Sequence, residues 1–209
     1  EMLPCAKPLK LRSGEDIELD SGDYPRLQLS AMKTMNWSNF SDRQKRAWQE
    51  GRRLGIGLAN YVEGTGRGPY ESVTIRINRN GRIQIVSGAA AMGQGVGTAL
   101  AQIVCENLGG DINLVDLSLG DTTEPYGFGG FNSRLTVVAG ASADAASRLV
   151  REKILNVAAH VLEVSRETLH LEAGLVSVAD SNQFITFSDL AKLAEGLPGY
   201  SLPGIKSPG

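Results

Sequence analysis

Two glycine-rich stretches carry the residues whose types and spacing could do chemistry: "AMGQGVGT" at 91–98 and "GFGGFNSR" at 127–134. Each stands directly before a run of apolar residues with helical spacing, so each is expected to lead into a helix. A helix N-terminus has free N–H groups and a partial positive charge, which suit an anion and phosphate above all. Glycine removes the Cβ and lets a ligand approach the backbone. The two stretches are therefore candidate anion-binding loops.

Polar side chains in these loops extend the chemistry that backbone N–H groups could do. Gln94 offers a donor and an acceptor on one amide, which suits the edge of a heterocycle or a metal oxo group. Ser133 adds a hydroxyl and Arg134 a guanidinium fork. Arg134 could equally lie on the surface or form an ion pair with Asp121. The loops match no nucleotide-binding fingerprint, because "GQGVGT" lacks the Lys-Ser/Thr of a P-loop.

The elements that must position these loops alternate between strands and helices. We expect a helix capped by Asp23, a second helix capped by Ser41 or Asp42, and a final short helix from Ser188. The hairpin is the clearest pattern, since Val73, Ile75 and Ile77 alternate with polar residues before an Asn-Gly turn. The remaining expected elements are strands at 54–64, 112–120, 168–178 and 184–187, a hairpin at 71–88, and helices at 96–108 and 135–164. This order predicts an α+β fold, with a mixed or antiparallel sheet and helices packed on one face.

Composition excludes several function classes. The formal charge of −2 gives no basic excess, so the chain is not expected to bind nucleic acid. No apolar run reaches the length that spans a membrane. Cys5 and Cys105 stand far apart, and His160 and His170 have no ligand spacing, so no metal site is expected on these side chains. Reduced thiols suggest a cytoplasmic protein.

The order of motifs also suggests domain limits. Residues 1–52 are expected to be an N-terminal connector with helices, and residues 53–195 to form the domain that carries the glycine-rich loops. Residues 196–209 are rich in Pro and Gly and are interpreted as a linker or a chain end. The chain begins with "EMLPCAKPLKLRSG", which is typical of the middle of a longer protein.

Three segments together resemble the large, molybdenum-binding subunit of the xanthine dehydrogenase/aldehyde oxidase family, including its carbon monoxide dehydrogenase-like and aldehyde dehydrogenase-like bacterial branches. They are "GIGLANYVEGTGRGPYES", "GAAAMGQGVGTALAQIVCENLGG" and "GDTTEPYGFGGFNSRLTVVAGASADAA". The resemblance implies an oxidoreductase that hydroxylates an aldehyde or an N-heterocycle, with water as the oxygen source. It implies a molybdenum–pterin cofactor, in bacteria commonly the cytosine dinucleotide form. This chain would hold the start of the second cofactor-binding domain.

The resemblance also assigns residues. Those expected to bind the cofactor are Met92, Gly93, Gln94, Gly95, Gly130, Phe131, Asn132, Ser133 and Arg134. Tyr61 and Glu63 match a stretch near the family's substrate funnel. The family's catalytic glutamate stands in a Gly-Glu-Gly-like motif that this sequence lacks, so the base is expected outside this chain and the isolated chain is expected to be inactive. None of Glu63, Glu71 and Glu106 is expected to be the base, and all three are interpreted as structural in that respect.

Partners follow from the same resemblance. Iron–sulfur clusters and FAD would lie on other subunits or domains of an oligomeric enzyme, because this chain lacks the cysteines that clusters need. An alternative remains: an interaction or assembly module that keeps the fold without the catalytic parts. The two intact loops favour the cofactor-binding interpretation.

Overall fold

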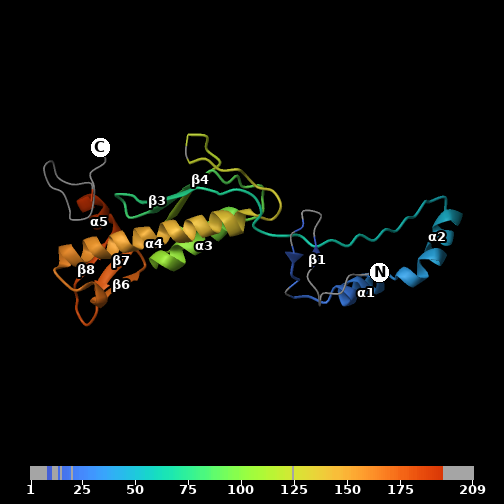
Figure 1. Cartoon of the computed structure of the whole chain (residues 1–209), viewed down its shortest axis with the longest axis horizontal. Coiled ribbons are helices and arrows are strands. Elements are labelled where there is room, and N and C mark those ends of the chain that lie inside the picture. The colour runs from blue at the N-terminus through green and yellow to red at the C-terminus, as the bar shows by residue number, and fades with distance from the viewer. Residues whose placement is uncertain (1–8, 11–13, 15, 20, 124, 195–209) are drawn as a thin grey trace. The chain divides into compact units, whose positions relative to one another are not determined.

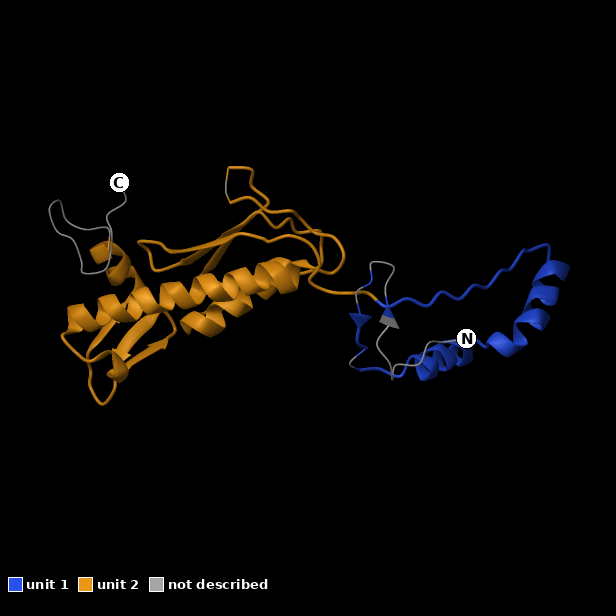
Figure 2. Cartoon of the chain, in the orientation of Figure 1, with its two compact units in different colours: residues 1–62 blue, residues 63–209 orange. Residues whose placement is uncertain are grey.

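The computed structural model describes residues 9–10, 14, 16–19, 21–123 and 125–194 (Figure 1). The chain divides into two compact units, residues 1–62 and 63–209 (Figure 2). This division falls after the boundary that was placed at residue 52 from the sequence. The stretch 196–209, interpreted as a linker or chain end, lies outside the described residues.

Among its described residues, the first unit contains two helices, a 3-10 turn between them and a small strand pair. Its elements are β1 (Leu9–Lys10), β2 (Asp16–Ile17), α1 (Tyr24–Thr34), the 3-10 turn Trp37–Asn39 and α2 (Phe40–Gln49). Asp23 caps α1 as expected, with its Oδ1 accepting from the Arg26 N–H at 3.1 Å. The predicted cap of α2 is wrong. The helix begins at Phe40 after Asn39, so Ser41 and Asp42 lie in its first turn.

The predicted strand at 54–64 is also wrong, because this segment has no regular secondary structure. Gly55 and Gly57 interrupt the apolar residues, and no described strand pairs with the segment. A strand is stabilised mainly by cross-strand pairs, so an alternating pattern without a partner stays extended and irregular.

The second unit is built on a mixed three-stranded sheet in the order β3-β4-β5. The strands are β3 (Val73–Ile77), β4 (Ile83–Ser87) and β5 (Val115–Leu119). β3 and β4 form the predicted antiparallel hairpin, with Ile75 opposite Ile85. Gly81 takes the left-handed backbone that the turn requires, with φ of 80°. β5 pairs with β4 in parallel, with Leu117 beside Ile85.

Two helices cover one face of this sheet (Figure 1). They are α3 (Val96–Leu108) and α4 (Leu135–Leu162), and they pack against each other along most of α3. The core between sheet and helices contains Ile83, Ile85, Leu100, Val104 and Ala139, each at most 1% exposed. The predicted α+β arrangement is confirmed. Gly109 ends α3 in the left-handed conformation, as expected from the Gly-Gly sequence.

A second, antiparallel sheet and a short helix complete this unit. The elements are β6 (Leu169–Glu172), β7 (Leu175–Val178), β8 (Phe184–Thr186) and α5 (Phe187–Ala194). Val176, Phe187 and Leu190 belong to the same core cluster as the first sheet. No helix in the described part of the chain combines the length and apolarity that crossing a membrane requires.

Candidate functional site

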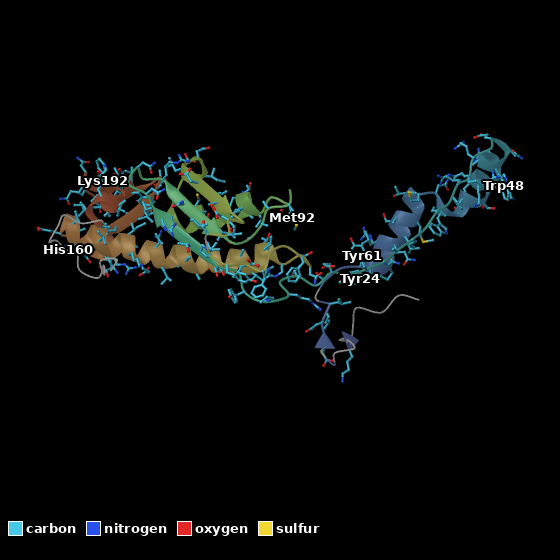
Figure 3. The ribbon with its side chains drawn as sticks, turned by 90° about the horizontal axis from the view of Figure 1, so that it is seen from above. Tyr24, Trp48, Tyr61, Met92, His160 and Lys192 are labelled. Carbon is cyan, nitrogen blue, oxygen red and sulfur yellow. The ribbon has the colours of Figure 1, made fainter. Side chains whose placement is uncertain are left out.

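Helices α3 and α4 run side by side in the same direction and therefore begin at the same end of the unit. A Cβ on Gly140 of α4 would lie 3.0 Å from Cδ1 of Ile103 of α3. One turn further along, Asn107 Nδ2 donates to Asp144 Oδ1 and to Ser147 Oγ, both at 2.8 Å. Figure 3 shows Met92 at the end of the unit where the helices begin and His160 at the other end. The positive ends of two helix dipoles thus converge there.

The loops that lead into these helices touch each other at the same end. We define the first loop as residues 88–95 and the second loop as residues 125–134. A Cβ on Gly130 would lie 2.5 Å from Met92 Cε and 3.7 Å from Gln94 Nε2. The structure therefore brings together the two groups of residues that the sequence analysis assigned to one cofactor.

A second contact between the loops runs through backbone atoms alone. A Cβ on Gly88 would lie 2.4 Å from Gly127 N and 2.6 Å from Pro125 O, distances that no side chain tolerates. Gly127 has no space for a side chain of its own, since its Cβ would lie 2.2 Å from Glu71 Oε2. The sequence analysis did not find this contact, because Gly88 and Gly127 each read only as one more glycine in a loop.

The first loop presents open backbone to solvent. Gly93 and Gly95 have φ of 90° and 78°, and a Cβ on either would meet no atom within 4 Å. Gln94 Oε1 accepts from the Met92 N–H at 2.6 Å, while Gln94 Nε2 donates to no described residue. No side chain caps the start of α3 at Gly95. The loop therefore keeps backbone amides and one side-chain amide available to a ligand.

The second loop holds two residues in an uncommon backbone conformation. Asn132 and Ser133 have φ of 48° and 49°, and neither is glycine. Left-handed backbone costs free energy for such residues and persists where the surrounding structure fixes it, often at ligand sites. As at α3, no side chain caps the start of α4. Both helices thus begin with amides that their own side chains leave unbonded.

Arg134, expected as a cofactor contact, points into the protein. The side chain is 1% exposed and stacks over Phe131, with its Cζ 4.9 Å from the ring centroid. Its N–H groups donate to Arg67 O at 2.9 Å, Gly129 O at 2.7 Å, Tyr70 O at 3.5 Å, Pro69 O and Glu71 Oε1. A guanidinium has five N–H donors, and five contacts use them all. The suggested ion pair with Asp121 is wrong, because the charged partner is Glu71.

Asp121 and Glu71 both serve the local structure of the loops. Asp121 Oδ1 accepts from the Thr123 N–H and hydroxyl, and these bonds hold the Asp121 pKa below its ordinary value. Glu71 is 2% exposed, and its Oε1 accepts from the N–H groups of Phe128 and Gly129, both at 3.0 Å. A structural interpretation of Glu71 therefore agrees with its contacts. The signal for burial was its place just before the alternating residues of β3.

The two residues matched to a substrate funnel lie outside regular structure. Tyr61 is 85% exposed and Glu63 is exposed. They fall on opposite sides of the division between the two units, so their role stays a prediction. Within the described part of the chain, no group of three or more His, Cys, Asp or Glu side chains could hold a metal ion.

One group of rings beside the loops was not anticipated from the sequence. Phe128 packs edge-on against Tyr70 and Tyr126, with ring centroids 5.4 and 5.1 Å apart. These rings stay between 44% and 64% exposed. Along the chain, the three aromatic residues alternate with Glu71 and Gly127, which face inward. This alternation is the sequence signal that could have predicted that the three rings lie on the same, outward side.

Comparison with known proteins shows the family to which the chain belongs. A model of the molybdopterin cofactor-binding domain matches residues 30–202, most of the chain. The chain belongs to this family. The resemblance inferred from the three sequence segments is thereby confirmed, and the loops lie inside the molybdopterin cofactor-binding domain.

Individual relatives agree with the family. The gamma subunit of the 6-hydroxypseudooxynicotine dehydrogenase complex of Paenarthrobacter nicotinovorans is 34% identical over 85% of this chain and 22% of its own length. The carbon monoxide dehydrogenase large chain of Hydrogenophaga pseudoflava is 34% identical over 91% of this chain and 26% of its own. The crystal structure of quinoline 2-oxidoreductase from Pseudomonas putida 86 matches with a TM-score of 0.65 and 30% identity, over 98% of this chain and 27% of that one. This molybdopterin-binding chain spans about a quarter of the length of these relatives.

Proposed function

We propose that this chain is the part of a molybdenum hydroxylase large subunit that holds one side of the molybdopterin cofactor. The observation that carries the proposal is the convergence of two uncapped, parallel helix starts, each preceded by a glycine-rich loop, at one end of a molybdopterin cofactor-binding domain. An interaction module would have no use for two such starts side by side.

The residues fit an anionic, heterocyclic cofactor. Backbone amides in the first turns of α3 and α4 bind its phosphate oxygens, because the amides have no side-chain cap and the helix dipoles favour negative charge there. Gln94 Nε2, which donates to no described residue, would donate to the heterocycle of the cofactor. Met92 and Phe131, 66% and 45% exposed, cover apolar parts of the cofactor.

The second loop contributes through shape more than through charge. A side chain at Gly130 would displace the end of Met92, and Asn132 and Ser133 turn the backbone into α4. Arg134 acts by fixing the loop, since its five donors are already used. Tyr61 and Glu63 belong to the approach of the substrate, and the catalytic base comes from outside this chain.

When bound, the molybdenum–pterin group supplies two-electron oxidation of an aldehyde or N-heterocycle, with water as the oxygen source. A dinucleotide form is the one that two helix starts side by side would suit, because a diphosphate needs several amide donors. That its base is cytosine follows from the family resemblance. Iron–sulfur and FAD partners in an oligomeric cytoplasmic enzyme would take up the electrons. The relatives' names support this in part, since one of them is a subunit of a dehydrogenase complex.

The experiment is to purify the complete protein that carries this chain and measure molybdenum by mass spectrometry and pterin by the fluorescence of its oxidised form. Mild acid hydrolysis followed by mass spectrometry identifies the nucleotide. We expect stoichiometric pterin, released with cytidine monophosphate. Replacing Gln94 with Leu should weaken the affinity for the cofactor about tenfold, the effect of losing one hydrogen bond to a charged or strongly polar group, and so lower the pterin retained after extended dialysis.

Gln102→Leu is the matched control, because Gln102 is exposed on α3, beyond its first turn. It should leave occupancy unchanged. Wild-type protein without pterin would contradict the proposed function. Another nucleotide would contradict only the cytosine form.

A further inference from the structure

We propose that Glu71 and Arg134 form a buried positioning pair that sets the second loop in the geometry that receives the cofactor. The inference rests on the proposed function, because the loop is the one assigned to the cofactor. The pair joins the segment before β3 to the residue that precedes α4, and both side chains have no exposed surface. Neither is offered as a contact to the cofactor itself.

The carboxylate of Glu71 orders the second loop from inside. One oxygen, Oε1, accepts three hydrogen bonds: from the N–H groups of Phe128 and Gly129 at 3.0 Å and from Arg134 Nη1. These amides lie immediately before Gly130, which touches Met92 of the first loop. The direction of two consecutive peptide planes is therefore fixed by a single buried oxygen.

Arg134 closes the same loop from its other end. Its Nη1 also donates to Gly129 O at 2.7 Å, so Gly129 is held through both its N–H and its carbonyl. Its Nε and Nη2 donate to the carbonyl oxygens of residues 67, 69 and 70. These bonds connect the loop to the segment before β3. A planar fork with five donors can do this, whereas the ammonium of lysine has three donors and no plane.

The energetics argue that the pair is kept for geometry. Burying two charges costs several kcal/mol per ion in general, and a well-packed apolar pair is often as stable. Here the second carboxylate oxygen, Oε2, has no hydrogen-bond partner within the described structure. Oε2 also excludes any side chain at Gly127, whose Cβ would lie 2.2 Å away. An arrangement that leaves a buried oxygen unpaired is poor for stability alone, but it fixes the place where the two loops touch.

The test uses the complete protein and four variants. Glu71→Gln removes the charge and keeps the shape. Arg134→Lys keeps the charge and loses the fork. Asp116→Asn is the control outside the loops, because Asp116 forms a partly exposed pair with Arg82, whose guanidinium also donates to the carbonyls of Asn113 and Val115. Arg82 stands at the start of β4, the opposite end from Gly88.

Three quantities are measured for each protein: the melting temperature, molybdenum and pterin content, and hydrogen exchange of the peptide covering 125–134 without cofactor. We expect Glu71→Gln and Arg134→Lys to lower pterin content by about tenfold or more, as for groups that orient ligands from behind. They should also speed exchange at Phe128 and Gly129. Asp116→Asn should lower the melting temperature while pterin content and exchange at 125–134 stay at wild-type values.

A fourth variant, Glu71→Asp, guards against misfolding, because it keeps the charge but draws the carboxylate back from the loop amides. It should fold and still lose pterin. The inference is overturned if Arg134→Lys and Glu71→Asp keep wild-type pterin, or if Asp116→Asn loses as much at an equal fall in melting temperature. It is also overturned if the amides of Phe128 and Gly129 exchange freely in the wild type. Absence of pterin from the wild-type protein would contradict the proposed function instead. In that case, hydrogen exchange of the loop still tests whether the Glu71–Arg134 pair orders it.

Discussion

Replacing Gly88 with Ala should separate the two loops. The added Cβ would lie 2.4 Å from Gly127 N, 2.6 Å from Pro125 O and 2.8 Å from Gly127 Cα, whereas ordinary contacts begin at 3.4 Å. All three are backbone atoms, so no flexible side chain can move aside. The second loop must therefore shift by about 1 Å to restore normal contact distances.

The size of the effect follows from that shift. Forcing a methyl group into a filled space costs about 1–3 kcal/mol. For a unit of this size, such a loss lowers the melting temperature by roughly 2–4 °C per kcal/mol. The displaced backbone is the part proposed to hold the cofactor, and losing the support behind such a ligand site costs about 10–100-fold in affinity or activity. We therefore expect a fall of a few degrees in melting temperature and a much larger proportional loss of bound pterin.

Differential scanning fluorimetry and pterin content measure the two effects, with Gly55→Ala as the control. Gly55 is exposed and lies outside both loops, and a Cβ there would meet no atom within 4 Å. The control should therefore keep the melting temperature and the pterin content of the wild type. Gly88→Ala protein with wild-type melting temperature and wild-type pterin would refute the loop-contact argument.

Two further predictions concern titration. Hydrogen bonds from Arg148 and Asn107 lower the pKa of Asp144, so its charge stabilises the fold above the ordinary pKa of aspartate, and that contribution is lost as pH falls through the lowered value. The melting-temperature gap between wild type and Asp144→Asn should therefore be largest at neutral pH and close in acid; a gap that widens on acidification would contradict this. Burial raises the pKa of Cys105, so in a Cys5→Ser background its alkylation by iodoacetamide at pH 8 should be slower than that of free cysteine and accelerate as pH rises further, and a rate equal to free cysteine at pH 8 would contradict it.

The sequence predicted most of the fold where local patterns decide it. The hairpin and helix α3 formed as expected because alternation and a 3.6-residue period each match the burial that tertiary packing requires. The strand predicted at 54–64 was wrong because no described strand pairs with this segment. Strand pairing depends on residues far apart in the sequence, which a local alternating pattern does not report. The start of α2 was missed by a few residues, since a 3-10 turn at Trp37–Asn39 leads into it.

The sequence predicted which loops form the candidate site, but it did not predict the side-chain directions and the contacts within it. Glycines before helical patterns pointed to both loops, but the direction of a side chain depends on what surrounds it. The sequence does not show whether the Arg134 side chain faces a ligand or the interior, and its partner Glu71 lies 63 residues away in the chain. Contacts of that separation leave no local period, so neither the pair nor the Gly88–Gly127 contact could be found by spacing.

The inward direction of Arg134 changes how the site must hold negative charge. Its charge is already balanced by Glu71, so it adds no net attraction for an anion. In the described parts of the two loops no other lysine or arginine is present. Under the proposed function, an anion here would therefore be bound mainly by amides and helix dipoles, which act within the first turn and weaken with salt less than exposed ion pairs do when the site is covered. Binding by amides requires a fixed backbone. The buried Glu71–Arg134 pair and the close contact of Gly88 with Gly127 both fix the backbone of these loops.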